Sequence, residues 1–471
     1  MKRKLLSLML ILSVLISLFP FKDVHADVAP PQTPPGSNLN PVDETTQVRM
    51  MAETVILNIR QDPQDDTGAI ADTTATFTMR NLGTAEEKMQ ARFPLSFFGG
   101  DSDGFGNFPE IEQIAVSVDG NSVATNRVMR PAMSSRGPAY IERAEVPWAS
   151  FEVTFPPGQD VTIEVAYTTS GYGYYPYEVF KYILETGAGW KDTIGAADII
   201  VRLPYEASNF NVWLPDETTE YFKTGPGGVL NGNEVRWHFE NLEPIEENNI
   251  KITVVTPTLW QNVLNETDTV SKNPNDGEAW GRLGKAYKEV AIMPKHGDPR
   301  MDSDGQELLQ LSQQAYEKCL ALLPKDPLWH FGYAELLWSQ YYFDIYLAQK
   351  PDTEGLFSRI LTELKTSLDL DSNNQRTKDL VSWISSSIPG SVSITDSGYD
   401  FLALTATPIP PKPLLFVTET PIPSPTVEVF SSPTPSLVPT GQTPTGSPVC
   451  GGAAFLVPFL VIALWWKRKI I

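Results

Sequence analysis

The chain has 471 residues, of which 36 are basic and 57 acidic, and its formal net charge is −21. Without residues 1–26 and the basic residues 467–469, 29 basic and 56 acidic residues remain, a balance of −27. Such a surface repels phosphate backbones and anionic lipid headgroups, so a nucleic-acid partner is not expected. The same acidity also serves to keep an exported protein soluble.

The N-terminus has the pattern of a secretory signal peptide. Lys2-Arg3-Lys4 precedes an apolar run from Leu5 to Phe19, and Val24-His25-Ala26 offers small residues at the cleavage positions. We therefore expect residues 1–26 to be removed on export and residues 27–43 to form a stiff, proline-rich leader. The two cysteines, Cys319 and Cys450, provide no disulfide framework.

Residues 44–257 are predicted to form an all-β sandwich region. Short apolar runs alternate with turns such as Asp119-Gly120-Asn121, which is the spacing of a sandwich. The predicted strands are Val48 to Ile59, Ala75 to Met79, Ile114 to Val118, Phe151 to Phe155, Val161 to Tyr167, Asp198 to Leu203, Asn211 to Leu214, Val235 to Phe239 and Ile250 to Val255. The region is one large domain or two small ones joined near residues 170–177.

That seam carries the tyrosines Tyr172, Tyr174, Tyr175 and Tyr177 on a glycine-rich stretch. Aromatic rings on such loops contact sugars or proteins, so these four are the candidate ligand-binding residues. The alternative is a hinge between domains that packs against its neighbour.

The β region also resembles known exported domains. The segment 182–190, which ends in Gly187-Ala188-Gly189-Trp190, looks like part of exported bacterial β-rich domains of unknown function. The segment 75–95, with Asn81-Leu82-Gly83, Glu87 and Arg92-Phe93-Pro94-Leu95, resembles the opening of vault and inter-alpha-trypsin type sandwiches. This resemblance implies an adhesion-like or scaffold role without a catalytic set. From the residues alone, we expect Trp190 to pack over the sheet.

Residues 258–390 are predicted to form a small all-α domain, because the apolar period shifts to that of helices. Trp280, Leu283, Gly284 and Tyr287, followed by Ser312, Tyr316, Cys319 and Pro324, resemble the two helices of a tetratricopeptide repeat. A weaker unit follows from Asp326, and the segment from Arg376 to Ile388 is expected to close the stack. The resemblance implies a protein or peptide partner, whereas degenerate repeats can also serve as a spacer.

Few motifs in the sequence indicate a metal-binding or catalytic site. Asp101, Asp103 and Asn107 have the alternating oxygen ligands of a Ca²⁺ loop, although a polar hairpin tip is the simpler interpretation; no other cofactor is expected. We found neither a nucleophile elbow nor a phosphate-binding glycine loop. Paired acids such as Glu110 with Glu112, or Glu243 with Glu246, leave a glycoside hydrolase as the enzymatic alternative.

The C-terminal part predicts a stalk and an anchor. Residues 391–449 are rich in Pro, Thr and Ser and are expected to be disordered, with 12 prolines between Thr405 and Pro448. In residues 450–471, a 16-residue apolar run precedes Lys467-Arg468-Lys469. We expect a transmembrane helix or a sorting signal that is processed or lipidated at Cys450.

These segments together predict a multidomain protein that is exported and anchored to the cell membrane or envelope, with most of the chain outside the cell. Its expected role is binding, as an adhesin or an assembly module without catalysis, and its expected partners are a protein or peptide at the helical repeats and, as a further candidate, a glycan. A carbohydrate-active enzyme on the β region and an inert structural envelope component are the alternatives.

Overall fold

The structure is a computed structural model that describes residues 40–41, 46–96, 110–131, 143–173, 175–214, 224–292, 303–342, 345, 351–352, 355–395 and 398–405. All described residues belong to one compact unit, Ala29–Pro408.

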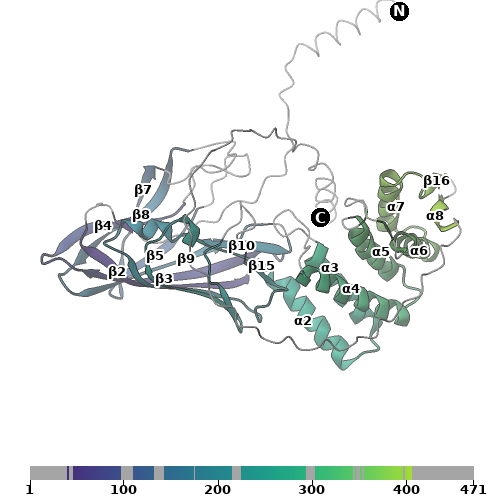
Figure 1. Cartoon of the computed structure of the whole chain (residues 1–471), viewed down its shortest axis with the longest axis horizontal. Helices are drawn as coiled ribbons and strands as arrows, with labels where there is room; N and C mark the ends of the chain where they lie inside the picture. The colour runs from purple at the N-terminus through teal and green to yellow at the C-terminus, as the bar shows by residue number, and fades with distance from the viewer. Residues whose placement is uncertain are drawn as a thin grey trace, which may run out of the picture. The chain divides into compact units, whose positions relative to one another are not determined.

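Strands occupy the first half of the described chain and helices the second, so the prediction of a β-rich region followed by a helical one is confirmed (Figure 1). The strands are β1 (Asn40–Pro41), β2 (Val48–Gln61), β3 (Ala69–Asn81), β4 (Glu87–Pro94), β5 (Ile114–Val118), β6 (Asn121–Val123), β7 (Asn126–Pro131), β8 (Glu145–Phe155), β9 (Asp160–Ser170), β10 (Tyr177–Tyr182), β11 (Ile194–Arg202), β12 (Val212–Trp213), β13 (Val229–Asn231), β14 (Glu234–Leu242) and β15 (Ile250–Val255).

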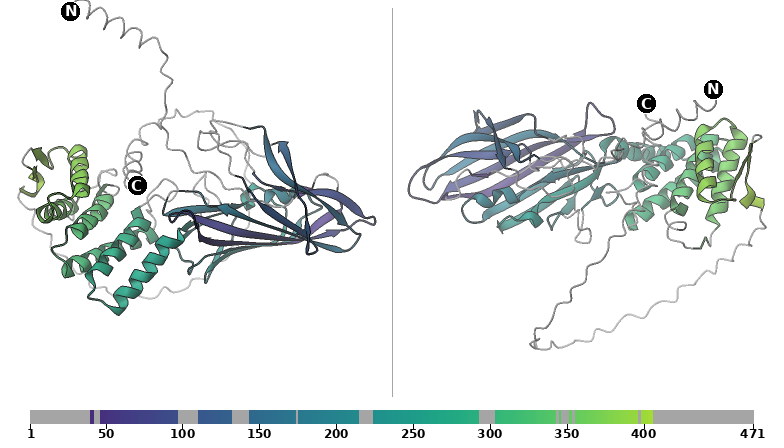
Figure 2. Two further views of the ribbon diagram at one scale, coloured as in Figure 1. Left: turned by 180° about the vertical axis from the view of Figure 1, so that it is seen from behind. Right: turned by 90° about the horizontal axis from the view of Figure 1, so that it is seen from above.

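An eight-stranded sheet, in the order β13-β14-β11-β2-β3-β9-β5-β6, is the largest element of the β region. Along β2 and β3, alternate side chains are buried, among them Val55, Leu57, Ala75 and Phe77. Since successive side chains of a strand point to opposite faces, this alternation gives the sheet one apolar inner face and one polar outer face. The long paired strands β2 and β3 are drawn in purple and blue in Figure 2.

A four-stranded sheet, β1-β4-β8-β7, covers the inner face of the large sheet. Phe93 of β4 packs against Tyr167 of β9, with ring centroids 5.3 Å apart. Trp190, which follows the short helix η1 (Glu185–Gly189), meets Phe155 of β8 edge to face and is buried, as expected from the sequence. The apolar core of the region therefore lies between these two sheets.

Strands from both sides of the predicted seam share the large sheet. β11, which follows the seam, runs parallel to β2 and pairs with it from Ala196 to Arg202. A smaller sheet, β10-β15-β12, holds the strand that begins directly after the seam. The helix η2 (Glu246–Asn248) precedes β15.

The helices are α2 (Pro257–Lys272), α3 (Gly277–Ile292), α4 (Ser303–Leu322), α5 (Pro327–Tyr341), α6 (Leu356–Leu370) and α7 (Gln375–Ser387). Consecutive helices pack on one another, and α5 also contacts α3 and α7. From Trp329 to Trp338, all α5 side chains except Glu335 are buried. A helix that is apolar all round belongs in the centre of a bundle, which explains the position of α5.

The same kind of turn precedes three of these helices. The side chain of Asp276 accepts a hydrogen bond from the backbone N–H of Ala279 (3.0 Å), and Asp326 accepts one from Leu328 (2.9 Å). Asn374 accepts one from the backbone N–H of Thr377 (3.2 Å). Each side chain satisfies a donor that a helix N-terminus leaves without an intrahelical partner.

Ordered structure continues past residue 390, where the predicted stalk begins. β16 (Ser393–Thr395) pairs with β17 (Gly398–Asp400), and α8 spans Leu402–Thr405. Val392 and Phe401 are buried, which gives this segment an apolar attachment that its composition did not indicate. Among the described helices, none combines the length and hydropathy required to span a membrane, and the predicted anchor lies outside the described residues.

Candidate functional site

A groove of about 1150 Å³ lies on the β region where β3, β9 and β5 run side by side. Its lining combines carboxylates, hydroxyls, amides and two tyrosines. The lining residues are Asp62, Pro63, Gln64, Ile70, Asp72, Thr73, Thr74, Glu110, Glu112, Gln113, Ile114, Ala115, Ala166, Tyr167, Thr168, Thr169, Ser170, Gly171 and Tyr172. The groove is the candidate ligand site.

Small side chains form part of the groove lining on the outer face of the large sheet. Thr74 of β3 pairs with Ala166 of β9, which pairs in turn with Ala115 of β5. Side chains in register across neighbouring strands stand next to one another on the same face. This row therefore gives the groove a flat surface without a bulky side chain.

The groove opens where β9 runs past the end of β5. The pairing of these strands stops at Ile114 opposite Tyr167, while β9 continues to Ser170 along β3. The chain before β5 turns toward the other sheet, because the backbone N–H of Ile111 donates to the carbonyl of Leu95 (2.9 Å). The resulting gap beside the end of β9 is the space that the groove occupies.

The loop between β2 and β3 forms one wall and is held by Gln61. The Gln61 side-chain amide donates to the carbonyls of Asp65 (2.7 Å) and Gly68 (2.8 Å). Its Oε1 accepts a hydrogen bond from the backbone N–H of Thr258, in the first turn of α2, at 3.1 Å. The wall is thus fixed both by its own turn and by the first helix.

Two groove carboxylates are each held by arginine. Asp72 accepts hydrogen bonds from Arg60, at 2.5 Å from Nε and 3.1 Å from Nη2, and from the Thr168 hydroxyl at 2.7 Å. The hydrogen bond from Arg60 is the main cause that lowers the pKa of Asp72, against the effect of desolvation. Asp72 is therefore an ionised acceptor of fixed orientation.

Glu110 is held in the same way by two arginines. Arg127 contacts its Oε2, and Nη1 of Arg143 donates to its Oε1 at 2.6 Å. Partial burial alone would raise the pKa of Glu110, but the hydrogen bonds from these arginines outweigh it and the pKa is lowered. Arg143 is itself positioned by a hydrogen bond to the Ser96 hydroxyl (2.7 Å).

A third carboxyl, Glu178 of β10, packs against the groove residue Gly171. A Cβ atom on that glycine would lie 2.6 Å from Glu178 Oε2, which is buried and accepts no hydrogen bond from any described residue. Burial and the charges of Asp65 and Asp62 raise the pKa of Glu178 to about 8. This carboxyl is therefore mostly protonated at neutral pH.

The structure separates the four predicted tyrosines. Tyr172 lines the groove. The Tyr175 hydroxyl lies 3.4 Å from Glu289 Oε2 of α3, and the buried Tyr177 donates to the carbonyl of Val290 at 2.6 Å. Tyr174 lies outside the described residues. Two of these side chains thus contact helix α3.

The other predicted site residues have different outcomes. Asp101, Asp103, Asn107 and Cys450 lie outside the described part of the chain. Within that part, no group of three or more His, Cys, Asp or Glu side chains is arranged to hold a metal ion. Glu110 and Glu112 both line the groove, whereas Glu243 and Glu246 do not.

Sequence reasoning missed the groove residues Asp72, Thr74 and Thr168. Their signal was present in the alternation of β3, where the outer positions read Asp72, Thr74, Thr76 and Thr78. A run of hydroxyls on one face of a strand marks a polar sheet face. The sequence did not show which strand lies beside it.

Polar side chains of the helical region mainly hold helices together. Lys288 of α3 is buried and lies 2.5 Å from Glu335 Oε2 of α5, and its ammonium lies 5.5 Å from the centre of the Tyr316 ring. Desolvation would lower the pKa of Lys288, but the charge of Glu335 outweighs it and the pKa is raised. This ion pair links α3 to α5 across the bundle.

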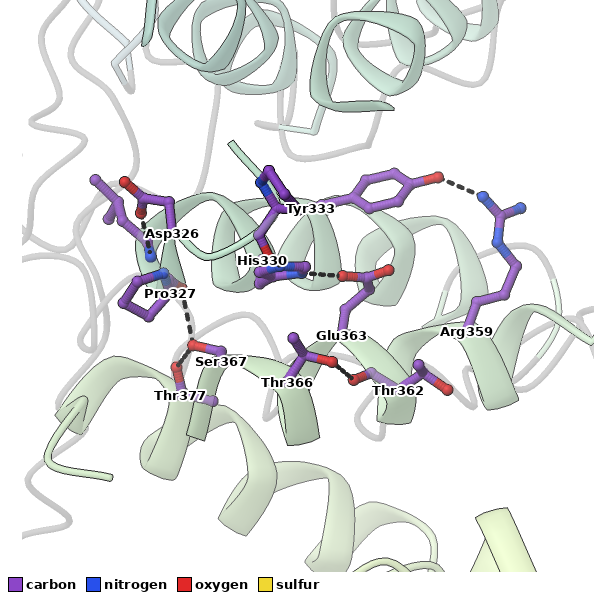
Figure 3. Close-up of polar contacts among 12 residues, drawn as sticks. Asp326, Pro327, His330, Tyr333, Arg359, Thr362, Glu363, Thr366, Ser367 and Thr377 are labelled. Atoms are coloured by element: carbon purple, nitrogen blue, oxygen red, sulfur yellow. Dashed lines mark hydrogen bonds and ion pairs between the residues drawn. The ribbon is translucent and has the colours of Figure 1, made fainter. Parts of the chain in front are cut away.

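A second polar contact joins α5 to α6 (Figure 3). His330 Nδ1 lies 2.5 Å from Glu363 Oε2, and Nε2 lies 3.1 Å from the carbonyl oxygen of Pro324. Desolvation opposes the charged form, but both acceptors favour it, and the net effect raises the pKa of His330. Because both ring nitrogens face oxygen acceptors, the doubly protonated imidazolium fits this site best.

Comparison with known proteins does not identify a family. No protein-family model matches the sequence, and no curated protein matches it. Among solved structures, a chain from Legionella pneumophila named a nutrient binding protein aligns with 61% of this chain and 99% of its own length, at 19% identity and a TM-score of 0.39. A likeness at this TM-score supports no inference about fold or function.

Proposed function

We propose that this chain is an exported, surface-anchored binding protein whose β region holds the ligand. The groove beside β9 carries this proposal. It is large enough for a small ligand, and its acceptors Asp72 and Glu110 are oriented by hydrogen bonds from arginines. Polar groups that are oriented before a ligand arrives lose little freedom on binding.

The helical region is proposed to be a short tetratricopeptide-like array that offers a second surface to a protein or peptide. The equivalent turns at Asp276, Asp326 and Asn374 support a repeating unit. So does the contact of α5 with both α3 and α7, since first helices of successive repeats pack side by side. Tyr175 and Tyr177 attach this array to the β region.

The location outside the cell is proposed from the sequence. The signal-peptide pattern of residues 1–26, the proline-rich tract between Thr405 and Pro448 and the apolar run before Lys467 together describe export, a stalk and an anchor. The anchor in this proposal is either a retained transmembrane helix or a sorting signal that is cleaved or lipidated at Cys450.

An enzyme at the same groove has weaker support. Hydrolysis of a glycoside by two carboxyl groups needs one of them protonated as the general acid. Arginines lower the pKa of Glu110, which does not suit that role, and the protonated Glu178 has a buried Oε2. We therefore favour binding without catalysis.

A blocked groove tests the proposal. Ala166→Trp places a large ring among the small side chains of the groove, and Thr162→Trp places the same ring on the same face of β9 outside it. The full-length chain in detergent is titrated by calorimetry with neutral oligosaccharides, sulfated oligosaccharides, spermine and a lysine-rich peptide. We expect at least one class to bind the wild type and the Thr162 variant but not the Ala166 variant. If no class of ligand shows this dependence, the groove is not a ligand site. The alternative of an inert structural envelope component is then favoured.

A further inference from the structure

The charged side chains of the groove lining are carboxylates. Its lining includes the carboxylates of Asp62, Asp72, Glu110 and Glu112, and among the described residues that line it none is a lysine, arginine or histidine. An anionic ligand would therefore find no cation to pair with among the described lining residues. Phosphorylated, sulfated and uronic-acid ligands are poor candidates for this site.

At Asp72 and Glu110, a strongly cationic ligand is disfavoured for a different reason. The charge of Asp72 is already paired with Arg60 in a two-point contact, and that of Glu110 with Arg127 and Arg143. A ligand cation would have to compete with guanidinium groups that are part of the fold. These two carboxylates therefore offer oriented lone pairs more than net charge.

A ligand that carries hydroxyl groups can use the hydrogen-bonding groups that remain in the lining. An ionised carboxylate has about four acceptor positions, so both Asp72 and Glu110 keep acceptor capacity beyond their arginine contacts. Thr74 and Ser170 add hydroxyls that both donate and accept. The Thr168 hydroxyl, which donates to Asp72, adds an acceptor, and Gln64 and Gln113 add amides. The flat row of Thr74, Ala166 and Ala115 leaves room for a ring.

We infer that the groove binds a neutral, polyhydroxylated ligand, an oligosaccharide, and that the arginine pairs of Asp72 and Glu110 set this preference by cancelling the charge of the acceptors. The inference rests on the proposed function and names the ligand class of the same site. Arg60 is a positioning residue in this scheme, because it acts on the ligand through Asp72.

The large sheet supplies a matched control. Arg80 and Asp160 form a second two-point pair between β3 and β9, at 2.5 and 2.6 Å, with side-chain exposures of 39% and 43%. The Arg60–Asp72 pair has exposures of 46% and 43%. Both pairs bridge neighbouring strands of the sheet, but neither Arg80 nor Asp160 lines the groove.

The test uses the full-length chain in detergent and three probes, namely a set of neutral oligosaccharides, their sulfated forms, and spermine. For the wild type we expect groove-dependent binding of a neutral oligosaccharide only. Asp72→Asn should weaken it about tenfold, because an amide is a poorer acceptor than a carboxylate. Arg60→Gln should weaken it less and create binding of spermine, since the charge of Asp72 is then exposed. Asp160→Asn and Arg80→Gln should change neither the binding of the neutral oligosaccharide nor that of spermine.

The possible outcomes distinguish a failure of the inferred ligand class from a failure of the proposed function. Groove-dependent binding of spermine or of the sulfated sugars by the wild type, without a neutral sugar, overturns the inference and leaves the proposed function standing. An Arg60→Gln variant that is folded by circular dichroism and gains no spermine binding overturns the role of the arginines. Absence of any groove-dependent binding overturns the inference together with the proposed function.

Discussion

In the β region, the pairs Arg60–Asp72 and Arg80–Asp160 lie on the outer face of a sheet, whereas in the helical region Lys288 and Glu335 meet between two helices. The side chains of the first two pairs are 39–46% exposed, while the Lys288 side chain is 4% exposed. Exposed pairs contribute little to stability, but a buried charge depends on its partner. These two pairs of the β region thus stay accessible to solvent, whereas the Lys288–Glu335 pair holds two helices together.

The largest expected effect is in the helical region. Lys288→Met leaves the Glu335 carboxylate partly buried without its cation, so we expect the free energy of unfolding to fall by about 3–5 kcal/mol. Urea denaturation followed by helical circular dichroism measures it. If adding Glu335→Leu to the Lys288→Met variant restores most of the lost stability, the unpaired charge of Glu335 is the cause of the loss. Arg80→Gln on the sheet is the comparison and should have a far smaller effect, so a similar loss in both variants would contradict the contrast.

A buried carboxyl of the β region gives the next effect, with the opposite sign. The pKa of Glu178 is raised to about 8, so its contribution to stability is complete below about pH 4.5 and is lost as the pH rises toward 8. Glu178→Gln should therefore leave stability nearly unchanged at pH 4.5 and raise it by about 2–4 kcal/mol at pH 8. Denaturation at both pH values measures the difference, with the exposed Glu164→Gln as the control. A gain of the same size at both pH values would rule out titration of Glu178.

The smallest effect concerns His330, whose pKa is raised by its contacts with Glu363 and Pro324. Its stabilisation is fully present below about pH 6.5 and is lost as the pH rises through the raised pKa. His330→Asn should cost about 1–2 kcal/mol at pH 5.5 and less at pH 8.5. His238 of β14, which is exposed beside Asp198, is the matched control, and His238→Asn should have a much smaller effect. Equal losses at the two pH values would argue against a charged His330.

Many of the strands, and the helical region as a whole, were predictable because their signals are local. The alternation from Val48 to Ile59 predicted β2, and the helical period after Pro257 predicted a helical region where α2 to α7 lie. The buried Trp190 followed from its glycine-rich surroundings. Where the periodic pattern is strong, a strand or helix can be assigned without knowing which other element packs against it.

The groove was less predictable because it depends on partners far away in the sequence. Glu110 was named as one of several arbitrary acids, and its arginines are 17 and 33 residues away. Thr74 and Ala166 meet only through the register of β3 and β9. Of the four tyrosines, the sequence did not distinguish Tyr172, which lines the groove, from Tyr177, which bonds to α3. The order of strands in the sheet, which brings β9 beside β3, cannot be read from the residues of either strand alone.

The equivalent turns before α3, α5 and α7 have an evolutionary consequence. These helices begin at Gly277, Pro327 and Gln375, so the turns recur at intervals of about fifty residues with the same kind of capping side chain. An in-frame duplication of the gene segment between two such turns would add a helix pair whose ends match their neighbours. Lengthening the helical region in this way would leave the β region unchanged, so the length of the helical region and the ligand preference proposed for the groove are free to evolve separately.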